Sequence, residues 1–115
     1  MSQSLLSGLL QESCVAFKKG EAAIDSSTAQ QLADAISDWE ISDDNLYISK
    51  DFKFKNYYET IAFVNAVAWI AHQQDHHPDL KVSYNQCHIT YSTHSVGGLS
   101  RNDFICAARI NQLYT

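Results

Sequence analysis

Between residues 56 and 74, apolar side chains recur every three or four positions, which is the spacing of one face of an α-helix. The stretch contains neither proline nor glycine, so the sequence predicts a helix of about five turns here. The side chains expected to form its buried stripe are Tyr57, Ile61, Val64, Ala68 and Ala71, widened by Tyr58, Ala62, Trp69 and Ile70.

Before this helix, the pattern alternates as it does in a half-buried strand. Lys50 interrupts the apolar face of residues 46–55, which indicates a bulge or a sheet edge. Residues 39–41 are typical of a preceding strand, and the polar residues 42–45 of the turn between the two strands. We therefore expect a hairpin. The apolar face of its second strand consists of Leu46, Ile48, Phe52 and Phe54.

A second alternating stretch follows Pro78 and predicts another hairpin, with Asn85-Gln86 as its two-residue turn. We assign Tyr84 to the core of this hairpin rather than to a ligand, and we expect His88, on the opposite face, to be solvated. The cross-strand pairs that this turn predicts are Tyr84 with Cys87, Val82 with Ile89, and Leu80 with Tyr91.

Shorter helices are predicted at both ends of the chain. Asp25 and the two serines after it provide N-cap chemistry for a helix over residues 28–37. Ser100 and Asp103 have the spacing of a capping box, which begins a helix over residues 101–113. Residues 1–25 are weakly patterned. The order of elements predicts a single α+β domain over residues 1–115, with a four-stranded, largely antiparallel sheet and helices packed on one face.

Composition narrows the classes of function. The formal charge of −5 and the lack of a basic stripe argue against direct contact with nucleic acid. No run approaches the roughly 20 apolar residues of a membrane span, and the N-terminus lacks the pattern of a signal peptide. Cys14, Cys87 and Cys106 form no CxxC motif, so we expect reduced, buried thiols in a cytoplasmic protein.

The candidate chemistry lies in the histidines around Pro78. His72, His76 and His77 come just before it, at the end of the long predicted helix, and His94 follows two strands later. Proline removes a backbone donor and moves its predecessor out of the α region, so these side chains are well placed to line a cleft. Imidazole exchanges protons near neutral pH, so the cluster suits acid/base catalysis.

Two other interpretations of these residues are open. On a continuous helix, His72 and His76 would share a face, and with His94 they could form a three-histidine zinc site. However, Gln73 stands where helical zinc proteases carry a glutamate. His76 and His77 could also be an ordinary polar helix end, and Asp103 is assigned to its capping box rather than to catalysis.

Taken together, these residues resemble the pterin-4a-carbinolamine dehydratase family. The likeness runs from Trp39 to Ile110 and is weaker from Ser13 to Ile36. The residues that carry it are Trp39, Phe52-Lys53-Phe54, the long helix, His76-His77-Pro78, Tyr84, Ser92-Thr93-His94, Gly97-Gly98-Leu99 and Asp103-Phe104.

The resemblance implies dehydration of 4a-hydroxytetrahydropterin to quinonoid dihydropterin, the step that recycles the pterin of aromatic amino-acid hydroxylases. It marks His76, His77 and His94 as active-site residues, with His76 and His94 as candidate proton donor and acceptor and His77 as a positioning residue. His72 stands where the family often has glutamate and is a candidate auxiliary acid or base. The residues implied to contact the pterin are Asp75, His76, His77, Ser92, Thr93, His94 and Ser95.

The resemblance also implies an enzyme without metal or other cofactor, assembled as a homodimer or homotetramer. Some family members resemble partner-binding modules that act as dimerisation cofactors of a transcription factor, and this second function stays open. The sequence leaves open whether the pterin is biopterin, a bacterial pterin or a molybdopterin precursor.

Overall fold

The computed structural model describes the backbone of residues 2–114 and the side chains of residues 5–114. No helix in this range is both long and apolar enough to cross a membrane. Its order of elements confirms the predicted α+β fold. The elements are α1 (Ser2–Gln11), α2 (Ser26–Ala35), β1 (Glu40–Ile41), β2 (Ile48–Lys53), α3 (Tyr57–Gln74), β3 (Asp79–Val82), β4 (Gln86–Tyr91), the 3-10 turn η1 (His94–Val96) and α4 (Arg101–Leu113).

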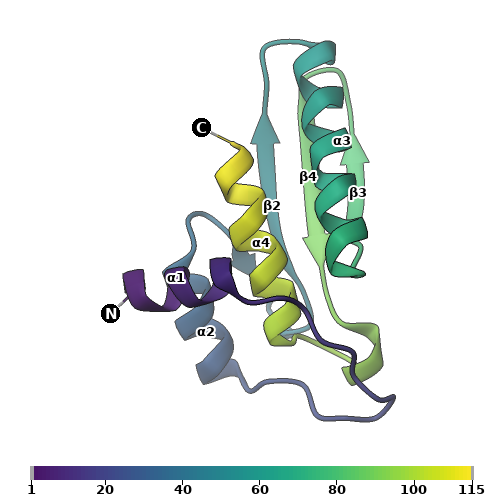
Figure 1. Ribbon diagram of the computed structural model, residues 1–115. Helices are drawn as coiled ribbons and strands as arrows, with labels where there is room; N and C mark the ends of the chain where they lie inside the picture. The colour runs from purple at the N-terminus through teal and green to yellow at the C-terminus, as the bar shows by residue number, and fades with distance from the viewer. Residues whose placement is uncertain (1, 115) are drawn as a thin grey trace.

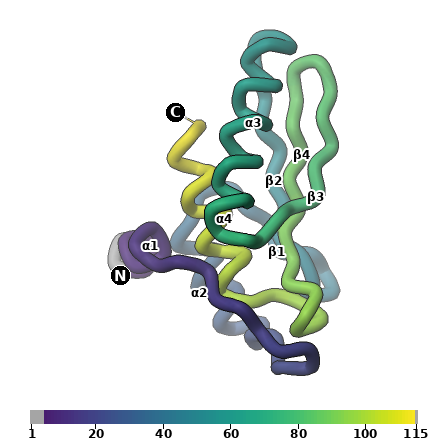
Figure 2. The backbone as a smooth tube through the Cα atoms, turned by 45° about the vertical axis from the view of Figure 1, so that its right-hand side comes forward, coloured from purple at the N-terminus to yellow at the C-terminus, as the bar shows by residue number. Residues whose placement is uncertain are grey.

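The four strands form one antiparallel sheet in the order β1-β2-β4-β3. Helices α3 and α4 lie side by side across one face of this sheet, and α1 and α2 lie beyond α4 (Figures 1 and 2). Cys87, Ile89 and Tyr91 of β4 are fully buried, whereas the alternate residues of β4 are partly exposed on the open face. The predicted packing of helices on one face is confirmed.

The core lies between the sheet and the two long helices. Helix α4 contributes an almost continuously buried stretch, because it packs on α3 and α1 as well as on the sheet. Leu9 of α1 is also fully buried, so the weakly patterned start of the chain is part of the folded unit. The largest core side chains are Tyr91, Phe52, Phe104, Leu9, Ile48, Ile89, Leu99, Ile110 and Val67.

The predicted buried stripe of α3 is wrong. The residues that α3 buries are Thr60, Phe63, Val67 and Ile70, whereas Tyr58 and Trp69 are 80% and 60% exposed. The helix is apolar on most of its surface, so spacing alone does not identify the face that meets the sheet. Thr60 is accepted in the core because its hydroxyl donates to the carbonyls of Asn56 and Tyr84.

The predicted turn of the second hairpin is also wrong by one residue. Leu80 pairs with Ile89 and Val82 with Cys87, so the two-residue loop is Tyr84-Asn85 and the register moves by two. Thr60 donates to the Tyr84 carbonyl and the Phe54 amide to that of Asn85, which fixes the loop from outside the hairpin. A shift of two keeps each side chain on its face. Tyr84 is nevertheless 63% exposed at the loop, so its assignment to the core is wrong.

The first hairpin forms as predicted, with a shorter second strand. Strand β2 begins at Ile48, and Leu46 belongs to the preceding turn and is 37% exposed. Lys50 pairs in regular register with Ile89, so it marks no bulge. Its ammonium instead donates to the Ser37 carbonyl and to Asn111 of α4, which satisfies a charge placed on the helix-covered face. Helix α2 runs two residues earlier than predicted, and Asp25 caps it by accepting from the Thr28 amide.

A coil between α1 and α2 crosses the end of α4 and continues along the turn that follows β4 (Figure 2). Asn102 fixes the position of this coil, because its side chain accepts from the Val15 amide and donates to the Val15 carbonyl. Further along, the Gly20 amide donates to the Ser95 carbonyl at 3.0 Å. Gly20 has a φ of 92°, which favours glycine at this bend. The coil therefore braces the turn that carries His94.

Candidate active site

The candidate site begins where α3 ends. Asp75 adopts a left-handed conformation with a φ of 52°, and the His76 amide donates back to the Ala71 carbonyl at 3.1 Å. Pro78 follows and prevents the helix from resuming. His76 thus lies beyond the last turn of α3, so the continuous helix on which His72 and His76 would share a face does not form, although both side chains line one cleft.

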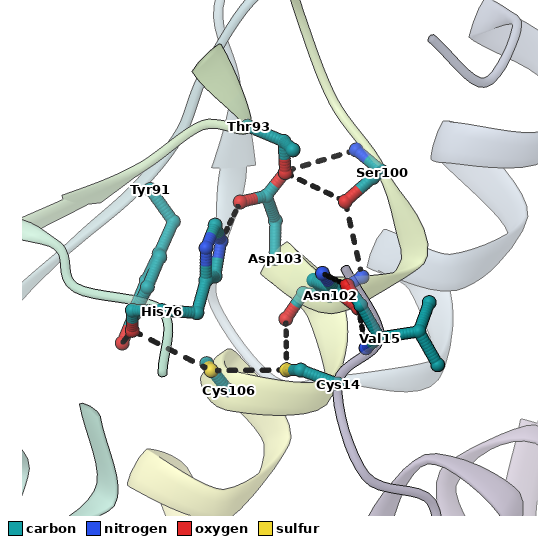
Figure 3. A network of polar contacts seen from close by, with 9 residues as sticks. All are labelled: Cys14, Val15, His76, Tyr91, Thr93, Ser100, Asn102, Asp103 and Cys106. Atoms are coloured by element: carbon teal, nitrogen blue, oxygen red, sulfur yellow. Dashed lines mark hydrogen bonds and ion pairs between the residues drawn. The ribbon is translucent and has the colours of Figure 1, made fainter. Parts of the chain in front are cut away.

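His76 is paired with a carboxylate from another part of the chain. Its Nε2 lies 2.6 Å from Oδ1 of Asp103, whose side chain has no exposed surface. The other oxygen of Asp103 accepts from the Thr93 hydroxyl and from the Ser100 amide (Figure 3). The predicted capping box is therefore confirmed, but Asp103 also anchors the imidazole of His76.

Tyr91 holds His76 from a second side. The two rings stack with centroids 5.1 Å apart, and the buried tyrosine hydroxyl donates to the His76 carbonyl at 3.1 Å (Figure 3). Burial raises the pKa of Tyr91, so its hydroxyl stays protonated and can donate across the physiological range. Burial lowers the pKa of His76, but the hydrogen bond and charge of Asp103, together with the charges of Cys106 and Asp75, raise it by more, so the net pKa is raised.

A cleft of about 540 Å³ opens beside this pair. The imidazoles of His77 and His94 are exposed at it, while Thr93 is buried and its hydroxyl is already bonded to Asp103 and Ser100. The cleft is lined by all seven residues that the sequence implied for substrate contact, Asp75, His76, His77, Ser92, Thr93, His94 and Ser95, together with Asp79 and Thr90.

His72 lies elsewhere. It lines a neighbouring cleft of about 410 Å³ with His76, His77, apolar residues of α3, Pro78 and Leu80. Its ring lies 5.6 Å from that of Trp69. The two clefts share only Asp75, His76 and His77, so His72 is not brought together with His94.

His88 lies on the open face of the sheet, where its Nδ1 is 2.6 Å from Asp51 and its side chain is 37% exposed. Larger hollows than the histidine cleft exist, at Lys50 and Asn111 and between Phe54 and Leu113. Neither contains the clustered imidazoles, so we place the chemistry in the smaller cleft. Among the described residues, no group of three or more His, Cys, Asp or Glu is arranged to hold a metal ion.

Residues 22–113 match the sequence model of a family described as pterin 4 alpha carbinolamine dehydratase. The chain belongs to this family. A Legionella pneumophila protein, whose name assigns it provisionally to the pterin-4-alpha-carbinolamine dehydratases, is 46% identical over 110 residues, which cover 95% of this chain and 97% of that protein.

Two relatives with the same provisional name are more similar over a shorter region. The Nitrosomonas eutropha protein is 61% identical over 75 residues, and the Nitrosospira multiformis protein 66% over 67 residues. The Nitrosomonas match covers 65% of this chain and 65% of the relative, and the Nitrosospira match covers 58% of this chain and 59% of the relative.

Among solved structures, a Brucella melitensis protein described as a transcriptional coactivator/pterin dehydratase superimposes with a TM-score of 0.78 at 28% identity. The match covers 81% of this chain and 99% of that one. A pterin dehydratase-like protein described as a RuBisCO assembly factor shares the fold at a TM-score of 0.59 and 23% identity, over 67% of this chain and 89% of its own.

Proposed function

We propose that this protein dehydrates a 4a-hydroxytetrahydropterin to the quinonoid dihydropterin. The observation that carries the proposal is the cleft where His76, His77 and His94 meet, with His76 anchored to a fully buried carboxylate. Such an imidazole–carboxylate pair is typical of an acid/base site, because the carboxylate fixes the orientation of the ring and its proton. Membership of the family supplies the class of substrate.

Dehydration of a carbinolamine needs two proton transfers. One proton goes to the leaving hydroxyl and another leaves a ring nitrogen, whose lone pair expels the oxygen. His76 uses Nε2 to bond Asp103, so Nδ1 is the nitrogen that would exchange a proton with the substrate. Because Asp103 raises the pKa of His76, its protonated form is favoured and we assign it as the acid.

The remaining cleft residues take the other roles. His94, exposed at the same cleft, is assigned as the proton acceptor, and His77 as the group that positions the pterin ring. Asp75, Ser92 and Ser95 provide oxygens for hydrogen bonds to the donors of a pterin. In the cell this activity would recycle the cofactor of aromatic amino-acid hydroxylases, in the cytoplasm and without a cofactor of its own.

A direct assay tests this proposal. Purified protein is mixed with freshly generated 4a-hydroxytetrahydropterin, and the loss of carbinolamine absorbance is compared with the uncatalysed rate. We expect an acceleration proportional to protein concentration. His88→Ala serves as the matched control, because His88 lies on the open face, and it should retain the full rate. A rate equal to the uncatalysed one for the parent protein would refute the activity.

Self-association is a second candidate property. Tyr57, Tyr58 and Trp69 expose 49%, 80% and 60% of their surface along α3, which is unusual for large apolar side chains. We infer a homodimer or homotetramer through this face, and a partner-binding role of the kind named for the Brucella relative would use the same face. Light scattering on the parent and on Trp69→Glu tests it: a monomeric parent would contradict the inference.

A further inference from the structure

Two thiols from distant parts of the chain meet beneath the candidate site. Cys14, in the coil after α1, and Cys106, on α4, are 92 positions apart, yet their sulfurs lie 3.7 Å from each other (Figure 3). Cys106 is fully buried, whereas Cys14 is only partly buried. Cys14 is therefore the more accessible residue of the two.

We propose that Cys14 and Cys106 form a redox-active pair that a peroxide converts into an intramolecular disulfide. The sulfur atoms need to approach by less than about 2 Å to reach the bonding distance of a disulfide. Cys106 is fixed on α4, and the backbone at Cys14 and Val15 is hydrogen-bonded to Gln74 and Asn102, so the approach comes from rotation of the Cys14 side chain. Nothing in this proposal depends on the reaction that the histidine cleft catalyses.

The hydrogen bond between Cys14 and Cys106 shifts the pKa values of the two thiols in opposite directions, which assigns the attacking and the resolving role. The hydrogen bond between them lowers the pKa of Cys14, although burial opposes this. The same hydrogen bond and burial raise the pKa of Cys106. Thiolate is the nucleophilic form of cysteine, and Cys14 is both the less buried member of the pair and the one whose pKa is lowered. Cys14 is thus the attacking thiol and Cys106 the resolving one.

The chemistry is complete with a peroxide as the oxidant. The Cys14 thiolate attacks one peroxide oxygen; a sulfur–oxygen bond forms, the oxygen–oxygen bond breaks and hydroxide leaves. Cys14 is oxidised by two electrons to sulfenic acid, and the peroxide is reduced. The Cys106 sulfur then attacks the Cys14 sulfur, the disulfide forms, and the hydroxyl departs as water with the proton of Cys106.

The location gives the disulfide a structural consequence. The Cys106 sulfur also lies 4.0 Å from the His76 carbonyl oxygen, the same oxygen that the Tyr91 hydroxyl binds. The Cys14 amide donates to Gln74, the last residue of α3. Oxidation would remove the thiol donor and tie the coil covalently to α4. Because the cross-link closes a long loop in the unfolded chain, the oxidised protein should unfold at a higher denaturant concentration.

The full-length protein is treated with hydrogen peroxide and analysed by intact mass and peptide mapping. We expect a product lighter by two hydrogens, with Cys14 linked to Cys106, that a thiol reductant returns to the starting mass. No loss of two hydrogens would overturn the proposal. So would a disulfide that includes Cys87, a disulfide between two molecules, or sulfinic acid at Cys14 as the first stable product.

Three variants separate the roles. Cys106→Ala should accumulate sulfenic acid at Cys14, trapped by a 1,3-dione probe, and Cys14→Ser should form no disulfide. Cys87→Ala is the control and should oxidise like the parent, because Cys87 is buried on β4 and burial raises its pKa. If Cys106→Ala does not fold, Cys14→Ser still decides, since Cys14 lies in a partly exposed coil. A disulfide that persists in Cys14→Ser refutes the pair.

Discussion

Nε2 of His76 lies 2.6 Å from Oδ1 of Asp103, a carboxylate with no exposed surface. A buried carboxylate without compensating bonds is strongly destabilising. Asp103 has three such bonds: Oδ1 is bonded to His76, and Oδ2 accepts from the Thr93 hydroxyl and the Ser100 amide. The carboxylate is therefore part of the structural framework and, at the same time, a group that raises the pKa of His76.

Asp103→Asn should lower the pKa of His76, because the hydrogen bond and charge that raise it are removed while the burial that lowers it remains. If protonated His76 is the acid, activity falls as pH rises through its pKa. In the variant this fall should occur at lower pH. The titration of the His76 ring, followed by NMR, and the pH dependence of kcat/KM measure the two effects. An unchanged titration would contradict the assignment.

The same pair contributes to stability in a defined direction. The folded pKa of His76 is raised, so its contribution is fully present below the unfolded pKa of about 6.5 and is lost as pH rises through the folded value. Asp103→Asn should lose roughly 3 kcal/mol near pH 6. Ser100→Ala is the control: it loses a cap worth about 1 kcal/mol and should leave the His76 titration in place.

His76→Ala and His94→Ala should each lower kcat by roughly 10²–10⁴, the range for one well-placed acid or base. Both side chains line the cleft, and neither belongs to the apolar core. His88→Ala should stay within twofold of the parent, because its partner Asp51 lies on the open face. Circular dichroism would establish that each variant is folded. Rates close to that of the parent for both His76→Ala and His94→Ala would contradict the acid/base roles of these two histidines.

Local patterns in the sequence were sufficient for the helices and strands from α2 to α4, whereas α1 was not predicted and the set of cleft residues came from the resemblance to the family. Pro78 marked the end of α3, and Ser100 with Asp103 marked the start of α4, because helix ends depend on nearby side chains. The face of α3 could not be predicted, because large aromatic side chains occur on both its buried and its exposed surfaces: Phe63 is buried, whereas Tyr58 and Trp69 are exposed.

Contacts between distant segments explain what sequence reasoning missed. The Thr60 hydroxyl, on α3, sets the turn at Tyr84, and no pattern within the hairpin reports it. The capping box was visible, but the spacing of Ser100 and Asp103 gives no sign that the carboxylate also meets His76. The meeting of Cys14 with Cys106 likewise requires the coil to cross α4.

Tyr91→Phe should keep the ring stack on His76 and remove the hydroxyl that donates to the His76 carbonyl. Loss of one buried hydrogen bond is worth about 1 kcal/mol of unfolding free energy. Tyr91→Leu removes the ring as well, so the His76 ring should adopt a broader range of orientations and kcat should be lower than that of Tyr91→Phe. Denaturant unfolding and kcat for the two variants measure these effects. Equal kcat for both and the parent would show that Tyr91 only fills the core.

Dehydration should survive treatment with EDTA or phenanthroline. The reason lies in the donors: Nε2 of His76 is bonded to Asp103, and His72 faces a different cleft from His94. The three-histidine arrangement considered from the sequence is therefore not assembled. Activity after chelation, together with elemental analysis of the purified protein, checks this. Loss of about one zinc per chain in parallel with activity would contradict it.

His72→Ala should reduce kcat/KM less than His76→Ala does. His72 lines the neighbouring cleft, and only Asp75, His76 and His77 line both that cleft and the candidate site.

A carboxylate at position 72 would favour the protonated form of His76 and move the pH–rate profile upward. Because His72 is exposed, solvent and salt would screen this effect. We therefore expect His72→Glu to be active with an upward shift well below one pH unit, which shrinks as ionic strength increases. Profiles of kcat/KM from pH 5.5 to 9 at two salt concentrations measure it. A profile identical to the parent for both variants would exclude His72 from the site, whereas a loss as large as that of His76→Ala would place it among the catalytic groups.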